Sequence, residues 1–325
     1  MIPMYQPEDI SPHLDIAALL PAAKEAFCAI SDGTAQAPVY VLHPNDMADI
    51  HVKSACLPDC PIFTVKMAGW SQVLLDRGEP ASSGLIVVFD SITCKPIAIL
   101  QDNHLISDYR TAAAGALVAD LLAPREVANA LVVGTGMQAR LQVEALLLSR
   151  RVPQIAIWGR DPVKAEQLRE NLGTTHPNTQ FSLVGDLATT VPQADVILTA
   201  TAAKDPVIHA DWLRPGQHIT SVGSDDATKC EIDPQALAKA EVFVDARTSG
   251  EAFGSPHRAM AQGIITGGDL TEIGTCLQNG AARGAKDITL ACLSGLGIQD
   301  LTAVRHLWHK IQSTSQLDLT GKAAT

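Results

Sequence analysis

The sequence predicts an α/β protein in which a doubly wound parallel sheet of the Rossmann type is joined to a smaller, mostly antiparallel α+β domain. Three observations predict this fold. Short apolar runs alternate with helical stretches from Ala130 onward, a glycine-rich turn follows the first run, and residues 1–120 carry strand-like pieces separated by Pro, Gly and Asp. A chain of 325 residues also suits two domains.

Composition and charge exclude several classes of protein. Hydrophobic residues make up 46 % and charged residues 18 %, which supports a large core. The net charge is −11 without a basic run, so nucleic acid and membranes are not expected partners. The 7 cysteines and 10 histidines show no metal-site spacing, and we predict reduced thiols and no metal. Without a signal-peptide pattern at the start, we expect a cytoplasmic protein.

The strand and helix signals of the central region follow one another in order. Expected strands cover residues 130–134, 154–159, 181–185, 195–201, 218–223 and 241–246. A helix is expected over 137–149, and Asp161 with Pro162 predicts the N-cap and first residue of the next helix. Right-handed crossovers then place every loop that follows a strand at one edge of the sheet.

The N-terminal part is expected to form a mostly antiparallel sheet. Its strand-like pieces are IHVKSACL, FTVKMAG, GLIVVFDS and KPIAILQD, and an alanine-rich helix is predicted over 111–123. A last helix over 298–311 is expected to pack back on this part. We therefore predict a substrate-binding and dimerisation domain of residues 1–123 with 298–325, and a dinucleotide-binding domain of residues 124–297.

A dinucleotide site is predicted at the turn after the first strand of the central region. Gly134-Thr-Gly136-Met-Gln-Ala139 reads G-x-G-x-x-A between a strand and a helix. The first glycine permits the tight turn, the second lets backbone approach a pyrophosphate, and the small Ala139 lets helix and strand pack closely. Phosphates would sit on free N–H groups at the helix start. The alternative is a bare structural turn.

The end of the second strand predicts that NADP(H) is preferred, with NAD(H) possible. NAD-specific sites normally carry an acid there, which accepts hydrogen bonds from the ribose hydroxyls. This chain reads Trp158-Gly159-Arg160, and an arginine can pair a 2′-phosphate. The alternatives are that Arg160 stacks on the adenine or that Asp161 serves NAD.

Several charged residues lie among apolar or small residues. Lys53 and Lys66 lie in strand-like runs, Arg110 lies at an expected helix start, and Asp225 with Asp226 follows the strand over 218–223. Buried charges usually have partners, so these residues are candidates for a chemical site. Strand alternation gives a plainer interpretation, in which both lysines point to solvent.

Much of the chain, from about Pro38 to Asp300, resembles the ornithine cyclodeaminase/μ-crystallin family. The stretches that carry the resemblance are VKMAG, SSGLIVVFDSITCKPIAILQDN, SDYRTAAAGALVADLLAP, VVGTGMQARLQ, SVGSDDATKCEID, GDLTEIG and LSGLGIQD. The N-terminal part, with DIHVKSAC and PIFTVKM, is most similar to the ectoine-utilisation branch of that family.

The resemblance implies roles for individual residues. Lys66 matches the substrate-binding lysine, Arg110 the arginine between cofactor and substrate carboxylate, and Asp225 the acid/base aspartate, and we count Asp225 and Lys66 as catalytic. Gly159 falls where NAD-using members carry Asp. The residues that fall where the family contacts the dinucleotide are Ser83, Met137, Gln138, Thr201, Ser221, Val222, Lys229 and Ser294. We expect Gly295 beside the substrate.

Two departures from the family pattern bear on the substrate. Many members carry an arginine after the proline near the start, whereas this chain reads Ala37-Pro38-Val39-Tyr40, and we hypothesise that Lys53 replaces that carboxylate contact. The residues after Asp225 read DATK where cyclodeaminases typically have CPGK, which argues against strict ornithine cyclisation.

We therefore expect an NAD(P)H-dependent oxidoreductase that acts on the α-carbon C–N bond of a small amino or imino acid. It would be an α-imino acid or cyclic imine reductase, or an amino-acid dehydrogenase, with Asp225 supplying the proton that the nitrogen needs. Two alternatives stay open: a cyclodeaminase-type lyase that recycles its cofactor, and a ligand-binding protein of the μ-crystallin kind. The resemblance also implies a homodimer, since the family usually pairs through the N-terminal region.

Overall fold

Two sheets organise the chain, and each belongs to its own unit. The structure, a computed structural model, describes residues 2–280 and 287–321, with side chains described up to residue 313. Unit 1 comprises Met1–Arg110 with Leu296–Thr325, and unit 2 comprises Thr111–Gly295. Unit 2 holds a parallel sheet and unit 1 a mostly antiparallel one, which confirms the predicted fold class.

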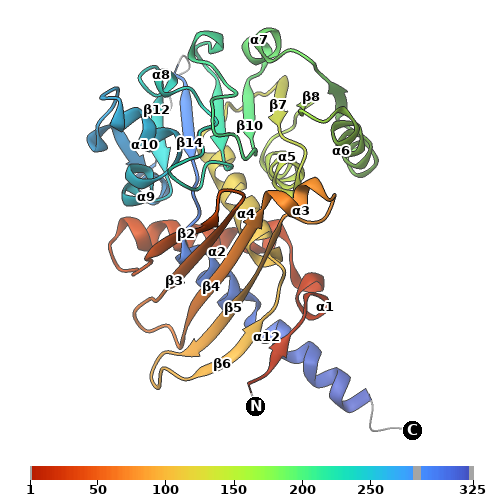
Figure 1. The fold of residues 1–325 in the computed structure, drawn as a ribbon, viewed down its shortest axis with the longest axis vertical. Coiled ribbons are helices and arrows are strands. Elements are labelled where there is room, and N and C mark those ends of the chain that lie inside the picture. Colours follow the sequence, from red (N-terminus) through yellow and green to blue (C-terminus); the bar gives the residue numbers. More distant parts are fainter. Residues whose placement is uncertain (1, 281–286, 322–325) are drawn as a thin grey trace. The chain divides into compact units, whose positions relative to one another are not determined.

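Unit 2 is built on eight parallel strands in the order β13-β12-β14-β11-β10-β7-β8-β9 (Figure 1). They are β7 (Asn129–Val133), β8 (Gln154–Trp158), β9 (Gln180–Leu183), β10 (Val196–Thr199), β11 (His218–Ser221), β12 (Glu241–Val244), β13 (Leu270–Glu272) and β14 (Thr289–Cys292). The order reverses between β7 and β10, because β8 continues from β7 on one side and β10 lies on the other. In such sheets a ligand binds outside the carboxyl ends of the strands at this reversal.

Helices cover both faces of the parallel sheet. They are α5 (Met137–Ser149), α6 (Pro162–Thr175), α7 (Leu187–Thr190), α8 (Pro234–Leu237), α9 (Arg247–Ala252), α10 (Gly254–Ala261) and α11 (Ile273–Asn279). Alternate residues of β7 enter different layers: Leu131 and Val133 pack on one side, Ala130 and Val132 on the other. Burial on both faces explains why the strands read as unbroken apolar runs.

The predicted start of α6 is confirmed. The Asp161 carboxylate accepts hydrogen bonds from Val163 N at 2.9 Å and Lys164 N at 3.2 Å, and Pro162 is the first helical residue. Its missing N–H is one that the helix start leaves unpaired in any case. Helix α5 also has the predicted bounds.

Unit 1 contains a six-stranded sheet in the order β1-β6-β5-β4-β3-β2, antiparallel except for the parallel pair β1–β6. The strands are β1 (Met4–Tyr5), β2 (Val39–Asn45), β3 (Ala48–Ala55), β4 (Ile62–Ser71), β5 (Ser82–Asp90) and β6 (Pro96–Leu100). The helices are α1 (Pro7–Ile10), α2 (Ile16–Ser31), α3 (Gln72–Asp76), the start of α4 (Leu105–Leu122), and α12 (Gly297–Gly321). The sequence predicted β3 to β6 but neither β1 nor β2.

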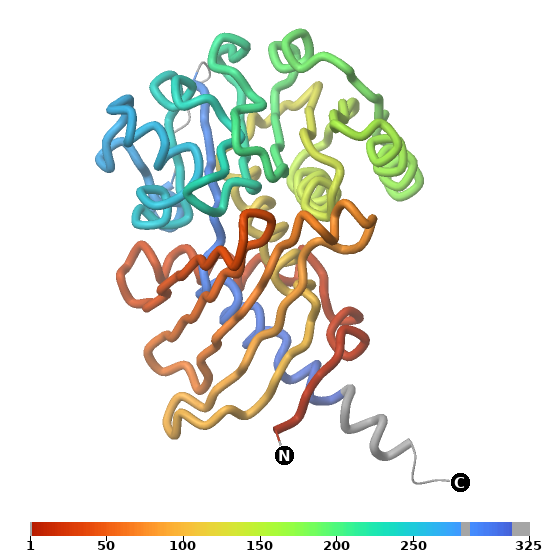
Figure 2. The backbone as a smooth tube through the Cα atoms, in the orientation of Figure 1, coloured from red at the N-terminus to blue at the C-terminus, as the bar shows by residue number. Residues whose placement is uncertain are grey.

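Helix α12 returns from the end of the chain to one face of this sheet. It packs against α2, β3 and β4, and Figure 2 shows the blue helix beside the orange strands. The face that α12 covers is called the inner face below, and the opposite one the outer face. The return of the last helix to the N-terminal strands matches the expectation from the sequence.

Some elements differ from those that the sequence predicts. Helix α2 was not predicted, although Asp15 caps it by accepting from Ala18 N at 2.7 Å, because Pro21 inside the segment argues against a helix. Helix α4 begins at Leu105 instead of Thr111, so Arg110 lies in its second turn. Strands β13 and β14, of 3 and 4 residues, were also not predicted.

The two glycines of the turn after β7 give a test of the fold. Gly134 has φ +129°, and a Cβ on it would lie 2.4 Å from the Ala200 carbonyl oxygen, whereas a Cβ on Gly136 would meet nothing within 4 Å. We expect Gly134→Ala to lower the free energy of unfolding by about 3 kcal/mol, since the strained backbone alone costs about 1–3 kcal/mol. Gly136→Ala should cost about 1 kcal/mol or less, because it only weakens the helix start. Urea unfolding measures both, and equal losses would contradict the assignment.

Candidate active site

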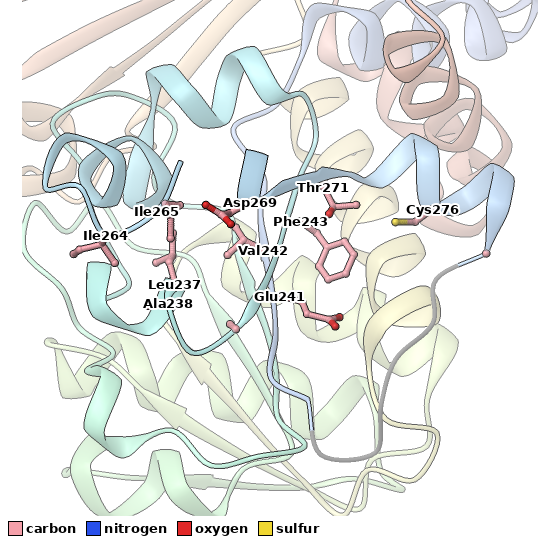
Figure 3. A pocket seen from close by; sticks show the side chains of 12 residues that line it. Leu237, Ala238, Glu241, Val242, Phe243, Ile264, Ile265, Asp269, Thr271 and Cys276 are labelled. Atoms are coloured by element: carbon pink, nitrogen blue, oxygen red, sulfur yellow. The ribbon is translucent and has the colours of Figure 1, made fainter. Parts of the chain in front are cut away.

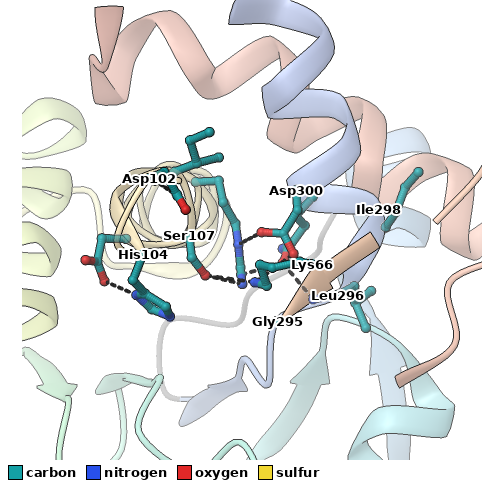
Figure 4. A network of polar contacts seen from close by, with 12 residues as sticks. Lys66, Asp102, His104, Ser107, Gly295, Leu296, Ile298 and Asp300 are labelled. Carbon is teal, nitrogen blue, oxygen red and sulfur yellow. Dashed lines mark hydrogen bonds and ion pairs between the residues drawn. The ribbon is translucent and has the colours of Figure 1, made fainter. Parts of the chain in front are cut away.

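Three charged side chains meet on the inner face of the unit 1 sheet (Figure 4). Lys66 Nζ on β4 lies 2.7 Å from Asp300 Oδ2, and Arg110 Nε on α4 donates to Asp300 Oδ1 at 2.9 Å. Their exposed fractions are 3 % for Lys66, 5 % for Arg110 and 0 % for Asp300. We call these three residues the Asp300 cluster. Burial of such charges is tolerated only when each has a partner of opposite sign.

Two uncharged side chains complete the hydrogen bonds of the Asp300 cluster. Ser107 Oγ accepts from Lys66 Nζ at 2.9 Å and from Arg110 Nη2 at 3.0 Å. Gln299 Oε1 accepts from Arg110 Nη1 at 2.9 Å and from Leu296 N at 3.0 Å. The guanidinium group is therefore fixed by three separate acceptors, which sets its plane as well as its position.

Burial and neighbouring charges act in opposite directions on the Asp300 cluster. Burial lowers the pKa of Lys66 below its ordinary value, the Asp300 carboxylate opposes this, and the Arg110 charge adds to it. Burial alone would raise the pKa of Asp300, but Arg110, Lys66 and Lys53 together hold it at about 2. Asp300 is therefore charged at neutral pH.

Lys53 joins the same face through strand register. It lies directly opposite Lys66 in the β3–β4 pair and is 4 % exposed. The interpretation that the strand lysines point to solvent is therefore wrong. Ser83 lies exposed at the start of β5, where side-chain alternation with the buried Ile86 places it on the outer face. The structure thus brings Lys53, Lys66 and Arg110 together, and leaves Ser83 apart from them.

A tight turn before α4 directs the first residues of this helix toward the Asp300 cluster. Asn103 and His104 both have positive φ, +49° and +78°, a conformation that non-glycine residues rarely adopt. Asp102 precedes them and caps the helix, with Oδ2 accepting from Ile106 N at 2.8 Å. Burial raises the pKa of Asp102 above its ordinary value. The turn sets Ser107 and Arg110 three residues apart on one face of α4, within reach of the same partners.

The turn after β7 in unit 2 has the shape that a pyrophosphate requires. Gly136 caps α5 and has open space where a side chain would stand, so a ligand can approach the backbone there. Met137 and Gln138 begin α5, whose first N–H groups have no partner within the helix. At the end of β8, a Cβ on Gly159 would lie 2.3 Å from Thr135 Cγ2, so glycine keeps this part of the edge compact.

Arg160 and Asp161, which follow β8, are in different situations. Arg160 is exposed, and no hydrogen bond or ion pair joins it to another residue in the described part of the chain. The Asp161 carboxylate already accepts two backbone hydrogen bonds as the cap of α6. Because these two hydrogen bonds hold the Asp161 carboxylate at the start of α6, they weigh against the alternative in which Asp161 serves the ribose of NAD.

A buried carboxylate that sequence reasoning did not single out holds two strand ends in unit 2. Glu231 is 0 % exposed and joins the ends of β10 and β11. Its donors are Thr199 Oγ1 at 2.9 Å, Thr201 N at 2.6 Å, Thr201 Oγ1 at 2.9 Å, Ser221 Oγ at 2.8 Å and Gly223 N at 2.9 Å. Burial raises its pKa, and these hydrogen bonds oppose the rise. The hydroxyls of Thr201 and Ser221, predicted cofactor contacts, thus donate to Glu231.

A second buried carboxylate plays the same part farther along the edge. Asp245 follows β12, and its Oδ2 accepts from Ser294 N at 3.0 Å and from Gly295 N at 2.6 Å. Ser294 Oγ also donates to Asp245 Oδ1 at 3.1 Å, and Gly295 has φ +76°. The predicted cofactor residue Ser294 and the predicted substrate residue Gly295 are therefore fixed by one acid. Val222 is held in a similar way by its N–H, which donates to Thr199 O at 3.0 Å.

The acid pair after β11 divides into an accessible and a structural residue. The Asp225 side chain is 33 % exposed, and its Oδ1 lies 2.7 Å from Lys229 Nζ. Asp226 is 2 % exposed, and its Oδ1 accepts from Thr228 N at 2.6 Å, Thr228 Oγ1 at 2.7 Å and Lys229 N at 3.0 Å. The Asp225 side chain is therefore accessible from outside, whereas Asp226 fixes the turn.

The structure also shows a pocket that contains none of the predicted site residues. It lies at the amino end of β12, between α8, β13 and α11 (Figure 3). The predicted cofactor residues of unit 2 lie at the opposite, carboxyl edge. Among the side chains of residues 2–280 and 287–313, no group of three His, Cys, Asp or Glu could hold a metal ion. No helix in those ranges is long and apolar enough to cross a membrane.

The sequence is similar to those of several proteins. An uncharacterized cyclodeaminase of Sinorhizobium fredii is 38 % identical over 269 residues, which cover 81 % of this chain and 80 % of that protein. A Delta(1)-pyrroline-2-carboxylate reductase of Paracoccus denitrificans is 34 % identical over 203 residues, which cover 61 % of this chain and 63 % of that protein.

Two solved structures share the fold at lower identity. The Delta(1)-pyrroline-2-carboxylate reductase of Thermococcus litoralis, in complex with NADH and L-proline, has a TM-score of 0.90 at 22 % identity and covers 97 % of this chain and 98 % of its own. An archaeal alanine dehydrogenase dimer with bound NAD has a TM-score of 0.87 at 23 % identity, with 97 % of both chains covered. The model of the ornithine cyclodeaminase/mu-crystallin family matches residues 3–315, and this chain therefore belongs to that family.

Proposed function

We propose that this chain is an NAD(P)H-dependent oxidoreductase that acts on the α-carbon C–N bond of a small amino or imino acid. The observation that carries the proposal is the Asp300 cluster, which presents a lysine and an arginine fixed out of water, as recognition of a carboxylate requires. Unit 1 would be the substrate-binding and dimerisation domain and unit 2 the dinucleotide-binding domain. All seven cysteines are unpaired, which fits the cytoplasm as its location.

The carboxyl edge of the unit 2 sheet fits a dinucleotide. Gly134, Gly136 and the start of α5 would hold the pyrophosphate, and Arg160 would pair a 2′-phosphate. When bound, the reduced nicotinamide supplies a hydride to the α-carbon of the substrate. Glu231 and Asp245 keep the strand ends that carry Thr201, Ser221 and Ser294 in one arrangement, so the edge needs no reordering on binding.

The remaining roles concern the substrate. Lys66 and Arg110 would hold its carboxylate, and Lys53 would add positive charge beside them in place of the family's missing N-terminal arginine. Asp225, oriented by Lys229, would exchange a proton with the substrate nitrogen. The accessibility of Asp225 supports a reaction over ligand binding alone, the μ-crystallin-like alternative.

A cyclodeaminase-type lyase is the second candidate, favoured by the name of the relative that is 38 % identical. Such an enzyme would release ammonia without net consumption of cofactor. The absence of an acid at Gly159 and the exposed Arg160 favour NADP(H), whereas a lyase that returns the same hydride would prefer a tightly held NAD, so these two residues favour the reductase.

The deciding experiment follows the absorbance of reduced nicotinamide. Purified protein is mixed with NADPH or NADH and with Delta(1)-pyrroline-2-carboxylate, or with pyruvate and ammonium as a source of a linear imine. Stoichiometric oxidation of the cofactor would establish the reductase and name its substrate class. No oxidation, together with release of ammonia from ornithine at constant cofactor, would establish the lyase instead.

Asp225 and Asp226 form a matched pair for testing the proton transfer. We expect Asp225→Asn to lower kcat by about 10²–10⁴-fold, the usual contribution of a general acid or base, with an unchanged Kd for NADPH. Asp226→Asn keeps the oxygen that accepts three hydrogen bonds but removes the buried charge that pairs with Lys229 Nζ at 3.4 Å, so it should lower thermal stability and change kcat far less. If both variants lose kcat equally, Asp225 has no chemical role.

Arg160 tests the choice of cofactor. Arg160→Asp should raise the KM for NADPH by about tenfold or more, because a charge-assisted pair is replaced by repulsion, and should leave the KM for NADH unchanged or lower. Arg151→Asp is the control, since Arg151 is also exposed but precedes β8 at its amino end. An NADPH-to-NADH ratio that is the same in both variants would rule out the pairing.

We further propose that the outer face of the unit 1 sheet binds a second copy of the chain. The exposed apolar side chains on this face are Tyr40 at 65 %, Leu42 at 57 %, Ile50 at 37 % and Met67 at 42 %. Phe63 on β4 and Phe89 on β5 stack with ring centroids 4.8 Å apart. A contiguous apolar face of this kind marks an interaction site, and the archaeal alanine dehydrogenase of the same fold is a dimer.

Light scattering after size-exclusion chromatography tests the dimer. The wild-type protein should have the mass of two chains, and Met67→Glu should raise the dimer dissociation constant by at least about tenfold, because it buries a charge in the interface. Ile92→Glu is the control: Ile92 is 89 % exposed, but it lies in the turn after β5, beyond the apolar face. A monomeric wild-type protein, or equal dimer affinity in both variants, would refute the proposal.

A further inference from the structure

We propose that Asp300 is a positioning residue for substrate recognition: it holds Lys66 and Arg110 in one arrangement, in which their remaining N–H groups bind the substrate carboxylate. The inference rests on the proposed function, since that assigns the carboxylate to Lys66 and Arg110. Asp300 itself would not touch the substrate, because both of its oxygens are occupied by these two cations.

The donors left over in the cluster match one carboxylate. An ammonium group has three N–H bonds and a guanidinium group five. Within the part of the chain that the structure describes, Lys66 donates to Ser107 and forms an ion pair with Asp300, which together account for two of its N–H bonds, and Arg110 uses three, on Asp300, Gln299 and Ser107. One N–H of Lys66 and two of Arg110 remain, and a carboxylate can accept all three.

The charge of the cluster points the same way. Two cations surround one anion, and all three are at most 5 % exposed. Water is therefore poorly placed to compensate the remaining positive charge, and a single anionic ligand would neutralise it. A zwitterionic amino acid or an imino acid supplies one carboxylate.

The position of Asp300 depends on a close approach between α12 and β3. A Cβ on Gly297 would lie 2.6 Å from Ser54 O and 3.1 Å from Ser54 N, both backbone atoms that cannot move aside. Glycine therefore lets the start of α12 rest directly on the strand. Asp300 follows in the first turn of the helix, at the level of Lys66 on the neighbouring strand.

Asp300 also controls the charge of Lys66. The groups that act on Lys66 are Asp300 on α12, Arg110 on α4, and Asp102 in the turn before α4, while Lys53 on β3 acts on Asp300. Burial and Arg110 lower the pKa of Lys66, whereas Asp300 and Asp102 raise it. Without the Asp300 charge the Lys66 ammonium group would lose its proton at lower pH, and carboxylate binding would weaken from that pH upward.

Two variants separate the charge of Asp300 from its geometry. Asp300→Asn keeps the shape and removes the charge, so the midpoint of Lys66 titration should fall by about one to three pH units. At pH values above this lower midpoint, the KM for the imino acid should rise relative to the wild-type protein. At pH values below it, the KM should return in part toward the wild-type value. Asp300→Glu keeps the charge and moves the carboxylate, so it should raise the KM at every pH with a smaller change of the midpoint. Binding of NADPH should stay at its wild-type Kd in both.

Two readouts keep this test independent of turnover. The ¹³Cε NMR signal of Lys66, assigned with Lys66→Arg, reports the titration directly, and calorimetry with L-proline and L-alanine reports carboxylate binding. If the wild-type protein binds these acids but reduces no imine, the proposed function fails while the role of Asp300 is still decided. A folded Asp300→Asn protein with the wild-type Lys66 midpoint and wild-type affinity for both acids overturns the inference, as does a wild-type protein that binds neither acid.

Discussion

The candidate site depends on the requirement that a charge taken out of water must meet a partner. Asp300, Glu231 and Asp245 are all at most 1 % exposed, and each is surrounded by donors from segments far apart in the sequence. Leaving any of them without its donors would cost several kcal/mol, so the segments are held in one arrangement. Each unit thus uses buried carboxylates to fix the side chains that we assign to ligand binding.

The groups that would exchange with a ligand are arranged differently from these anchors. Asp225 is one-third exposed, Arg160 is exposed, and the Gly136 backbone faces open space. Lys66 and Arg110 are buried, yet each keeps N–H groups beyond those used by its neighbours within the described residues. A preorganised site requires side chains that are fixed by buried partners and that still have donors for the ligand. Little ordering then remains to oppose binding.

The sequence predicts unit 2 better than unit 1, and the reason lies in the kind of signal. Local signals, such as the apolar run of β7 or the Asp161 cap of α6, depend on residues a few positions apart and were correct. Strand β14, whose four residues pair with β11 on one side and β12 on the other, was missed. Lys66, Arg110 and Asp225 were candidates because of their apolar or small neighbours in the sequence, and a family resemblance implied their roles. Asp300 and Glu231 lie in the stretches that carry it, but only the folded chain shows which residues each acid joins.

Strand β4 buries the polar parity of its side chains, which is why the interpretation that Lys53 and Lys66 point to solvent is wrong. Alternation predicted lysines in solvent, because Phe63, Val65 and Met67 on the other parity are the residues expected in a core. In the structure, Thr64, Lys66 and Ala68 are the buried ones, and the apolar parity is the more exposed. In a monomer, the apolar side chains of a strand are expected to face the core, and the burial of β4 is the reverse of this expectation. The inversion is explained if helices cover the polar face because it binds a charged ligand, and if a second chain covers the apolar face. The burial pattern of β4 is thus accounted for by the same two proposals, substrate recognition on one side of the sheet and pairing on the other.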